Sequence, residues 1–119
     1  MERAEPELSS ALGRITIAPA VIAEIVAQTA ARCYGVVGMA GGAKARVGRF
    51  LPGNRAHGIT VATGDDGVEV EVNVVVEYGL NLAEVAATVR SQVQYEVERL
   101  TGLRVAAVAV RIEDVRQSA

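Results

Sequence analysis

Aromatic residues are scarce in this 119-residue sequence, which has no tryptophan, one phenylalanine and three tyrosines. Apolar residues nevertheless make up 50% of the chain, so its core must consist of valine, isoleucine, leucine and alanine. The scarcity also argues against a broad stacking platform for single-stranded nucleic acid, because such platforms need exposed aromatic rings.

Cysteine and histidine occur once each, as Cys33 and His57. One cysteine excludes an internal disulfide and a Cys-rich zinc site, and one histidine in a predicted loop cannot build a metal site. Cys33 lies on the apolar stripe near the end of a predicted helix, where the helix dipole disfavours a thiolate. We therefore assign no catalytic residue, cofactor or metal, and predict that the protein is not an enzyme.

Long apolar runs are also absent, since none approaches the roughly 20 residues that span a bilayer. The start, "MERAEPELSS", is acidic and polar, unlike a signal peptide. The formal net charge of −2 gives no general attraction to nucleic acid or anionic lipid. We expect a cytoplasmic protein, with a peripheral position at the inner face of the membrane if a partner holds it there.

The chain divides into an expected flexible tail, residues 1–12, and one domain, residues 13–116. "GRITIA" alternates like a strand, and Pro19 then suits the first turn of a helix over residues 19–33. Gly35 follows where glycine commonly ends a helix. Residues 39–57 are the least regular part, with a short helix expected around Phe50.

The second half predicts a hairpin, a helix and a last strand. "GDDG" is typical of a tight turn. In the strand after it, one face carries the valines at 68, 70, 72, 74 and 76 together with Tyr78. The other face carries Glu69, Glu71, Asn73 and Glu77 and is predicted to be exposed to water. Asn81 caps a helix that ends at Gly102, and "LRVAAVAVRIEDV" reads as a strand. The fold class is therefore α+β: a two-layer domain with a small, mostly antiparallel sheet and two main helices on one face.

The stretch "CYGVVGMAGGAK" is rich in glycine, but it does not form a phosphate-binding loop of the Walker type. Counting from Gly38, Ala43 replaces the second glycine and Ala45 replaces the hydroxyl residue that holds magnesium. The segment also follows a helix, whereas a Walker loop joins a strand to a helix. It is better interpreted as a helix end and turn.

Positive charge gathers in one segment of this acidic chain. Residues 37–63 contain no acidic residue but include Lys44, Arg46, Arg49 and Arg55. Such a loop could hold a phosphate, a lipid headgroup, RNA or an acidic protein face, or it could be a solvated mobile loop. Glu69, Glu71 and Glu77 form one such acidic face, so self-association is physically available. Tyr95, expected on the exposed side of the second helix beside Arg99, is a further candidate contact residue.

The segments "GRITIAPAVIAEIVAQTAARCYGVVGMAGG", "VVVEYG", "VQYEV" and "TGL" resemble the alkaline shock protein family, envelope stress response proteins of Gram-positive bacteria. The resemblance covers residues 13 to 115 and implies a small, cytoplasmic, non-enzymatic α+β domain. Some members of the family are held at the membrane by a membrane-anchored partner and self-assemble. Shorter members with "CYGVVGMA" are similar to the products of genes that lie beside fatty-acid kinase or dihydroxyacetone-kinase-like genes. The Gly/Arg-rich loop departs from many members.

The leading hypothesis is thus a stress response protein that acts as a self-associating or partner-binding scaffold. The first alternative is a small nucleic-acid-binding module that uses the basic loop 44–57. Against it, the predicted open sheet face is acidic and lacks aromatic residues. The second alternative is a regulator of a neighbouring lipid-kinase-type enzyme. No small-molecule substrate is expected.

Overall fold

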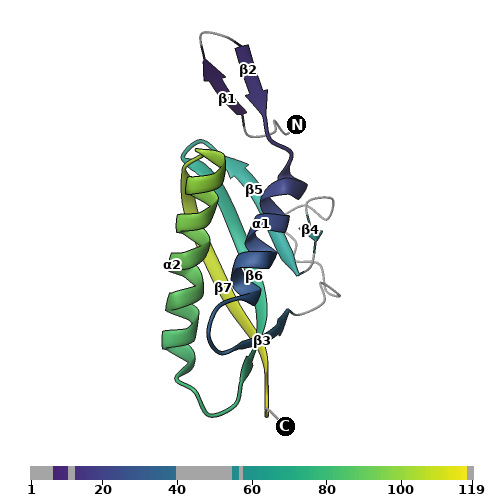
Figure 1. Ribbon diagram of the computed structural model, residues 1–119, viewed down its shortest axis with the longest axis vertical. Helices are drawn as coiled ribbons and strands as arrows, with labels where there is room; N and C mark the ends of the chain where they lie inside the picture. The colour runs from purple at the N-terminus through teal and green to yellow at the C-terminus, as the bar shows by residue number, and fades with distance from the viewer. Residues whose placement is uncertain (1–6, 11–12, 40–54, 57, 118–119) are drawn as a thin grey trace.

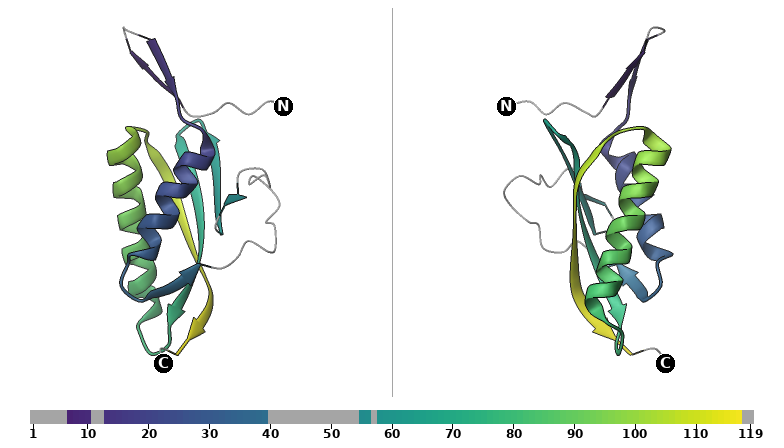
Figure 2. Two further views of the ribbon diagram at one scale, coloured as in Figure 1. Left: turned by 45° about the vertical axis from the view of Figure 1, so that its right-hand side comes forward. Right: turned by 90° about the vertical axis from the view of Figure 1, so that its left-hand side faces the viewer.

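The computed structural model describes residues 7–10, 13–39, 55–56 and 58–117. In this part of the chain, helices α1 (Pro19–Ala31) and α2 (Leu82–Thr101) cover one face of a five-stranded sheet (Figures 1 and 2). The two layers confirm the predicted α+β class. The sheet strands are β3 (Val36–Met39), β4 (Arg55–Ala56), β5 (Ile59–Gly64), β6 (Gly67–Glu77) and β7 (Val105–Arg116).

Strand β6 is the centre of the sheet and pairs with three other strands. β5 pairs antiparallel with its first half and β3 pairs antiparallel with its second half, so the two share one edge of β6. β7 runs parallel along the opposite edge, from Val68 to Glu77 of β6. The parallel pairing follows from the connection, because a strand that returns through a helix crosses over the sheet and keeps its direction.

Helix α2 begins and ends as its sequence predicts, whereas α1 begins at Pro19 as predicted but ends at Ala31, before the predicted residue 33, with Arg32 rather than Gly35 at its C-cap. Pro19 lies in the first turn of α1, where its missing N–H costs nothing. Asn81 accepts a hydrogen bond from the Glu84 N–H at 3.0 Å and so caps α2, while Gly102 ends it with φ +75°. The turn between β5 and β6 is the predicted two-residue hairpin, since Gly64 pairs with Gly67.

The core lies between the helices and the sheet and is built largely from valine. One face of β6 supplies five valines, and α2 supplies four more at a spacing of four residues. Burying each such side chain contributes about 1.5–3 kcal/mol, so this layer replaces the aromatic core that the composition lacks. The core valines are Val68, Val70, Val72, Val74 and Val76 from β6, and Val85, Val89, Val93 and Val97 from α2.

Two segments differ from the expectation. Residues 7–10, expected in the flexible tail, form β1 (Glu7–Ser10), which pairs with β2 (Gly13–Thr16) in a hairpin at one end of the molecule (Figure 1). Leu8 of this hairpin packs against the core, which gives the pairing an apolar anchor. Residues 36–39, expected in a turn, form β3 because their backbone reaches the edge of β6 that β5 leaves unpaired. The short helix expected around Phe50 lies outside the described residues.

Candidate functional site

The basic residues that the sequence singled out fall mostly outside the described part of the chain. Lys44, Arg46 and Arg49 lie outside the described residues. Arg55 is the exception, since its backbone belongs to β4 and pairs with Thr60. The proposed contact between these residues and an acidic protein face therefore stays a prediction.

The acidic residues do lie together on β6, on the face away from the helices. This face is less open than the sequence predicts, because Glu71 is only 4% exposed and Glu69 and Glu77 are half-buried. Val75, on the same face, is also buried. Alternation along a strand shows which residues share a face, but it does not show how far that face is covered. Tyr95 is 60% exposed, as expected, and is far along α2 from the features described next.

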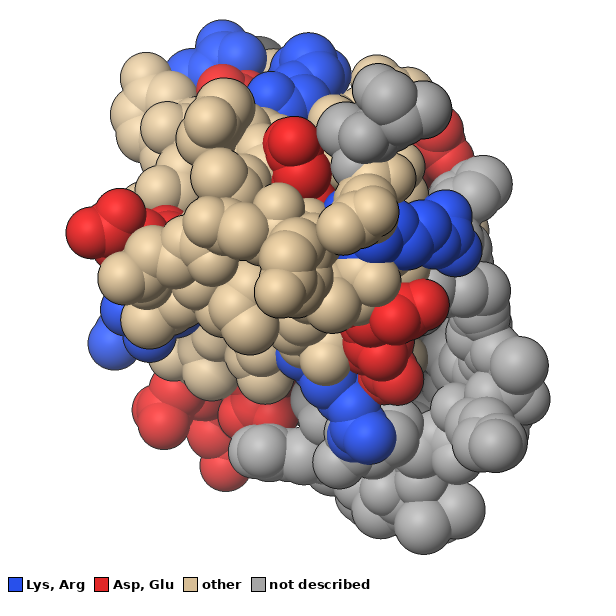
Figure 3. All heavy atoms as spheres, turned by 90° about the horizontal axis from the view of Figure 1, so that it is seen from below, with Lys and Arg blue, Asp and Glu red and all other residues tan. Residues whose placement is uncertain are grey.

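Several exposed apolar and aromatic side chains belong to segments at the end of the molecule opposite the β1–β2 hairpin (Figure 1). Here the end of α1, the start of β3, the turn after β6 and the end of β7 meet. Seen from this end, uncharged side chains occupy the centre of the surface and charged ones surround it (Figure 3). We call this surface the aromatic end; its residues are Tyr34, Val37, Tyr78, Leu80, Leu82 and Val115.

Backbone hydrogen bonds hold these segments together. The Glu77 N–H donates to the Gly35 carbonyl at 2.8 Å, and the Tyr78 N–H donates to the Arg116 carbonyl at 2.7 Å. Gly35 and Gly79 both have positive φ, at +91° and +101°, which lets the chain turn sharply on either side of the surface. The backbone beside both tyrosines is thus held by hydrogen bonds to other segments of the chain.

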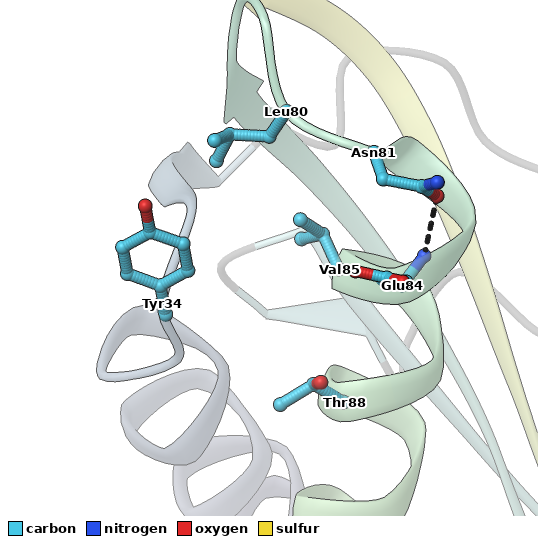
Figure 4. Close-up of a pocket in the computed structure, with 6 residues that line it drawn as sticks. All are labelled: Tyr34, Leu80, Asn81, Glu84, Val85 and Thr88. Carbon is cyan, nitrogen blue, oxygen red and sulfur yellow. Dashed lines mark hydrogen bonds between the residues drawn. The ribbon is translucent and has the colours of Figure 1, made fainter.

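A shallow pocket of about 150 Å³ opens beside Tyr34, between the end of α1 and the start of α2 (Figure 4). Tyr34 faces Leu80 and Val85 across it, and Thr88 lies one turn farther along α2. Asn81 and Glu84 form its polar rim and are joined by the helix-capping hydrogen bond. A pocket of this size and lining accepts an apolar or aromatic side chain rather than a whole cofactor.

Cys33 lies one residue before Tyr34 but is not arranged as a nucleophile. Its thiol donates a weak hydrogen bond to the Thr29 carbonyl at 3.5 Å, and partial burial raises the pKa of the thiol, opposed by the nearby charge of Arg32. A thiol with a raised pKa stays protonated near pH 7 and reacts slowly. Among the described residues, no group of three or more His, Cys, Asp or Glu side chains is placed to hold a metal ion.

The sequence did not point to the aromatic end. The prediction that Tyr78 continues the buried face of β6 is wrong: β6 ends at Glu77, and Tyr78 is 64% exposed in the turn that follows. Tyr34 is 77% exposed, and the sequence analysis did not single it out. The available signal is that both tyrosines stand immediately before a glycine at the end of a regular element, where a chain reverses and its side chains leave the core.

These features define a small α+β domain that exposes apolar and aromatic side chains at one end. The family comparison agrees: residues 7–117 match the alkaline shock protein family, described as having a cell envelope-related function, and the chain belongs to that family. This confirms the resemblance stated above.

Individual relatives in Gram-positive bacteria also support membership of this family. The chain is 32% identical over 113 residues to the uncharacterized protein YloU of Bacillus subtilis, a match that covers 92% of this chain and 94% of that one. It is 30% identical over 113 residues to a stress response regulator gls24 homolog of Streptococcus pyogenes, covering 92% of this chain and 63% of the relative. No solved structure matches the chain. Neither helix in the described residues is long and apolar enough to cross a bilayer.

Proposed function

We propose that this protein is a non-enzymatic scaffold of the envelope stress response, which binds a protein partner through its aromatic end. The observation that carries the proposal is that two highly exposed tyrosines, Tyr34 beside a pocket and Tyr78, lie on segments joined by the hydrogen bond from the Glu77 N–H to the Gly35 carbonyl. Tyrosine is enriched among the few residues that supply most of the energy in protein interfaces. The family, with its envelope-related function, and the stress-related name of the streptococcal relative support the setting.

The shape of the aromatic end favours a protein as the partner. Seen from this end, uncharged side chains lie at the centre with charged ones of both signs around them, an arrangement like that of an interface with a polar rim (Figure 3). An anionic membrane surface would instead be matched by clustered basic residues. We propose a cytoplasmic location, with any membrane position supplied by the partner.

A photo-cross-linking experiment tests the proposal, with Tyr95 as the matched control. A benzophenone amino acid is placed at Tyr78 in one variant and at Tyr95 in another, since the two tyrosines are 64% and 60% exposed. Cells are irradiated under cell-wall stress, and the cross-linked protein is identified and purified. We expect a specific product from position 78 and none from position 95.

Titration of the purified partner then measures the contribution of the site. Replacing both Tyr34 and Tyr78 with Ser should weaken binding about 30-fold or more, because truncating one central aromatic residue commonly costs about 2 kcal/mol. Tyr95→Ser should leave the affinity unchanged. Equal losses in the two variants, or equal cross-linking at both positions, would reject the aromatic end as the binding surface.

A further inference from the structure

Strand β7 has one edge paired with β6, and no strand among the described residues pairs with its other edge (Figures 1 and 2). Backbone directions can be assigned at both ends of the strand. The Arg104 and Arg116 carbonyls accept hydrogen bonds from Val68 and Tyr78 on the β6 side. Because successive residues of a strand direct their polar groups to opposite sides, Val105 and Val115 direct theirs toward the outer edge.

Side chains of the protein itself satisfy the donors at the two ends of this outer edge. The Val105 N–H donates to Glu98 Oε2 at 3.0 Å, and the Val115 N–H donates to Asp114 Oδ1 at 2.8 Å. Register shifts opposite Val68/Glu69 and Val74/Val75 leave Ala107–Ile112 as a regular run between them. Side chains of the protein thus occupy the N–H donors at both ends of the edge. Between them lies a segment of about six residues, the length of an average strand, which we call the open segment.

The open segment lacks the features that normally protect an edge strand. Natural edges carry lysine, proline or inward-pointing charges that block pairing with another chain. Here residues 107–112 read "AVAVRI", without a lysine or a proline. The one charge, Arg111, belongs by alternation to the face away from the helices and pairs with Glu113 at 2.7 Å. Val108, Val110 and Ile112 pack against the core and are half-buried, so apolar surface remains at the edge on the helix side.

Helix α2 lies along this edge and limits what can bind there. The hydrogen bond from Val105 to Glu98 shows that the helix stripe containing Glu98 faces the outer edge. At a spacing of four residues the same stripe includes Gln94 and Arg90, both exposed. A second copy that paired its own β7 here would bring its own α2 into the same space, because a two-fold axis places both helices on one side of the sheet. A single extended segment brings no helix.

We propose that the outer edge of β7, from Ala107 to Ile112, binds an extended segment of a partner protein as an added strand. Main-chain hydrogen bonds supply the attraction, and alternate side chains supply the selectivity. The residues of the segment that face the helix layer should be apolar, since they land beside Val108 and Val110. Arg90 on the flanking helix stripe favours an acidic residue in the segment. This surface is separate from the aromatic end.

Peptide selection tests the proposal on the full chain. A library of random seven-residue peptides displayed on phage is selected against the folded protein, and the enriched peptides are synthesised. We expect alternating apolar residues in them and protection of the amides of residues 107–112 from hydrogen exchange. Failure to enrich any peptide, or protection confined to the aromatic end, would overturn the proposal.

Backbone methylation distinguishes strand addition from side-chain binding. An enriched peptide is made in two forms, N-methylated at its odd or at its even residues. Only one form loses the N–H groups that face β7, so one should bind at least tenfold more weakly and the other should bind normally. Equal binding of the two forms would contradict pairing through the main chain.

A variant of the protein completes the test. Val110→Lys introduces an inward-pointing charge at the edge and should weaken peptide binding at least tenfold. Ser91→Lys adds the same charge on the exposed side of α2 and should have no effect; circular dichroism checks that both fold. If Val110→Lys does not fold, the comparison of the two methylated peptides still tests whether the peptide pairs with β7 through its main chain. Protection of residues 107–112 that rises with protein concentration, without peptide, would favour a second copy and overturn the proposal.

Discussion

Gly35 lies between α1 and β3, at a point where a side chain has neither a suitable backbone nor space. Its φ is +91°, and a Cβ there would lie 2.9 Å from both Leu80 Cδ1 and Val85 Cγ2. We expect Gly35→Ala to lower the free energy of unfolding by about 2 kcal/mol, from backbone strain plus displacement of the pocket lining. Urea unfolding followed by circular dichroism measures the loss.

Gly79 is the matched control for this prediction. Its φ is +101°, but a Cβ there would meet no atom within 4 Å. Gly79→Ala should therefore show the backbone strain alone, about 1 kcal/mol. If the two variants lose equal stability, then the close approach of Leu80 and Val85 to Gly35 contributes nothing.

Cys33 gives a pH-dependent prediction with a definite sign. Burial raises the pKa of the folded thiol above its ordinary value of 9.0. As the pH rises past that value, the unfolded chain loses the thiol proton first, so deprotonation favours unfolding. The stability that Cys33 contributes is complete below about pH 8 and is lost as the pH rises through the folded pKa.

Comparison with Cys33→Ala isolates this effect, because all other groups titrate alike in the two proteins. Urea midpoints measured from about pH 7 to about pH 10.5 should fall more steeply for the wild type than for the variant. The thiol should also react with iodoacetamide more slowly in the folded protein than in urea at the same pH. Parallel pH profiles would show that the folded thiol titrates as in the unfolded chain.

At the scale of the element, the start of α2 depends on a hydrogen bond that one substitution removes. Asn81→Ala deletes the acceptor for the Glu84 N–H and should cost about 1 kcal/mol. Asn81→Asp keeps an acceptor and adds favourable charge at the helix N-terminus, so its stability should equal that of the wild type or exceed it. Thermal unfolding compares the variants; a loss in Asn81→Asp equal to that in Asn81→Ala would show that the cap is not the cause.

Both helices and the β5–β6 hairpin could be predicted because their signals are local. Helical apolar periodicity, Asn81 as a cap and "GDDG" as a turn each act within a few residues. β3 could not be predicted, because "VVGM" becomes a strand only when β6 offers it an edge. The burial of Glu71 was missed for the same reason: what covers a sheet face depends on residues far away in the chain.

The candidate site was predictable to a smaller extent than the fold. Tyr95 could be assigned to the exposed side of its helix because helical spacing decides that question. The three segments that carry Tyr34, Tyr78 and Val115 are joined by backbone hydrogen bonds between residues far apart in the sequence. No periodicity within any one segment carries that information.

At the scale of the whole molecule, the separation of charge along the chain predicts salt-dependent self-association. Replacing Arg46, Arg49 and Arg55 with Glu should preserve the fold and dissociate an oligomer held by basic and acidic surfaces. Light scattering at low and high salt measures this, since screening weakens exposed ion pairs. An oligomer that is unchanged in the variant would reject this interface. Repeating the measurement with RNA and with anionic vesicles tests the nucleic-acid and lipid alternatives.

The parallel pairing of β6 with β7 also determines when, during synthesis, the sheet is finished. β5 and β6 are neighbours in sequence and can pair as soon as both have left the ribosome, but β7 follows only after the whole of α2. At about 5–20 residues per second, that interval lasts a few seconds. During this interval, the edge of β6 that will pair with β7 has no partner. A chain in which β5 and β6 have left the ribosome but β7 has not therefore has an open strand edge, and such chains are prone to aggregate or to need a chaperone.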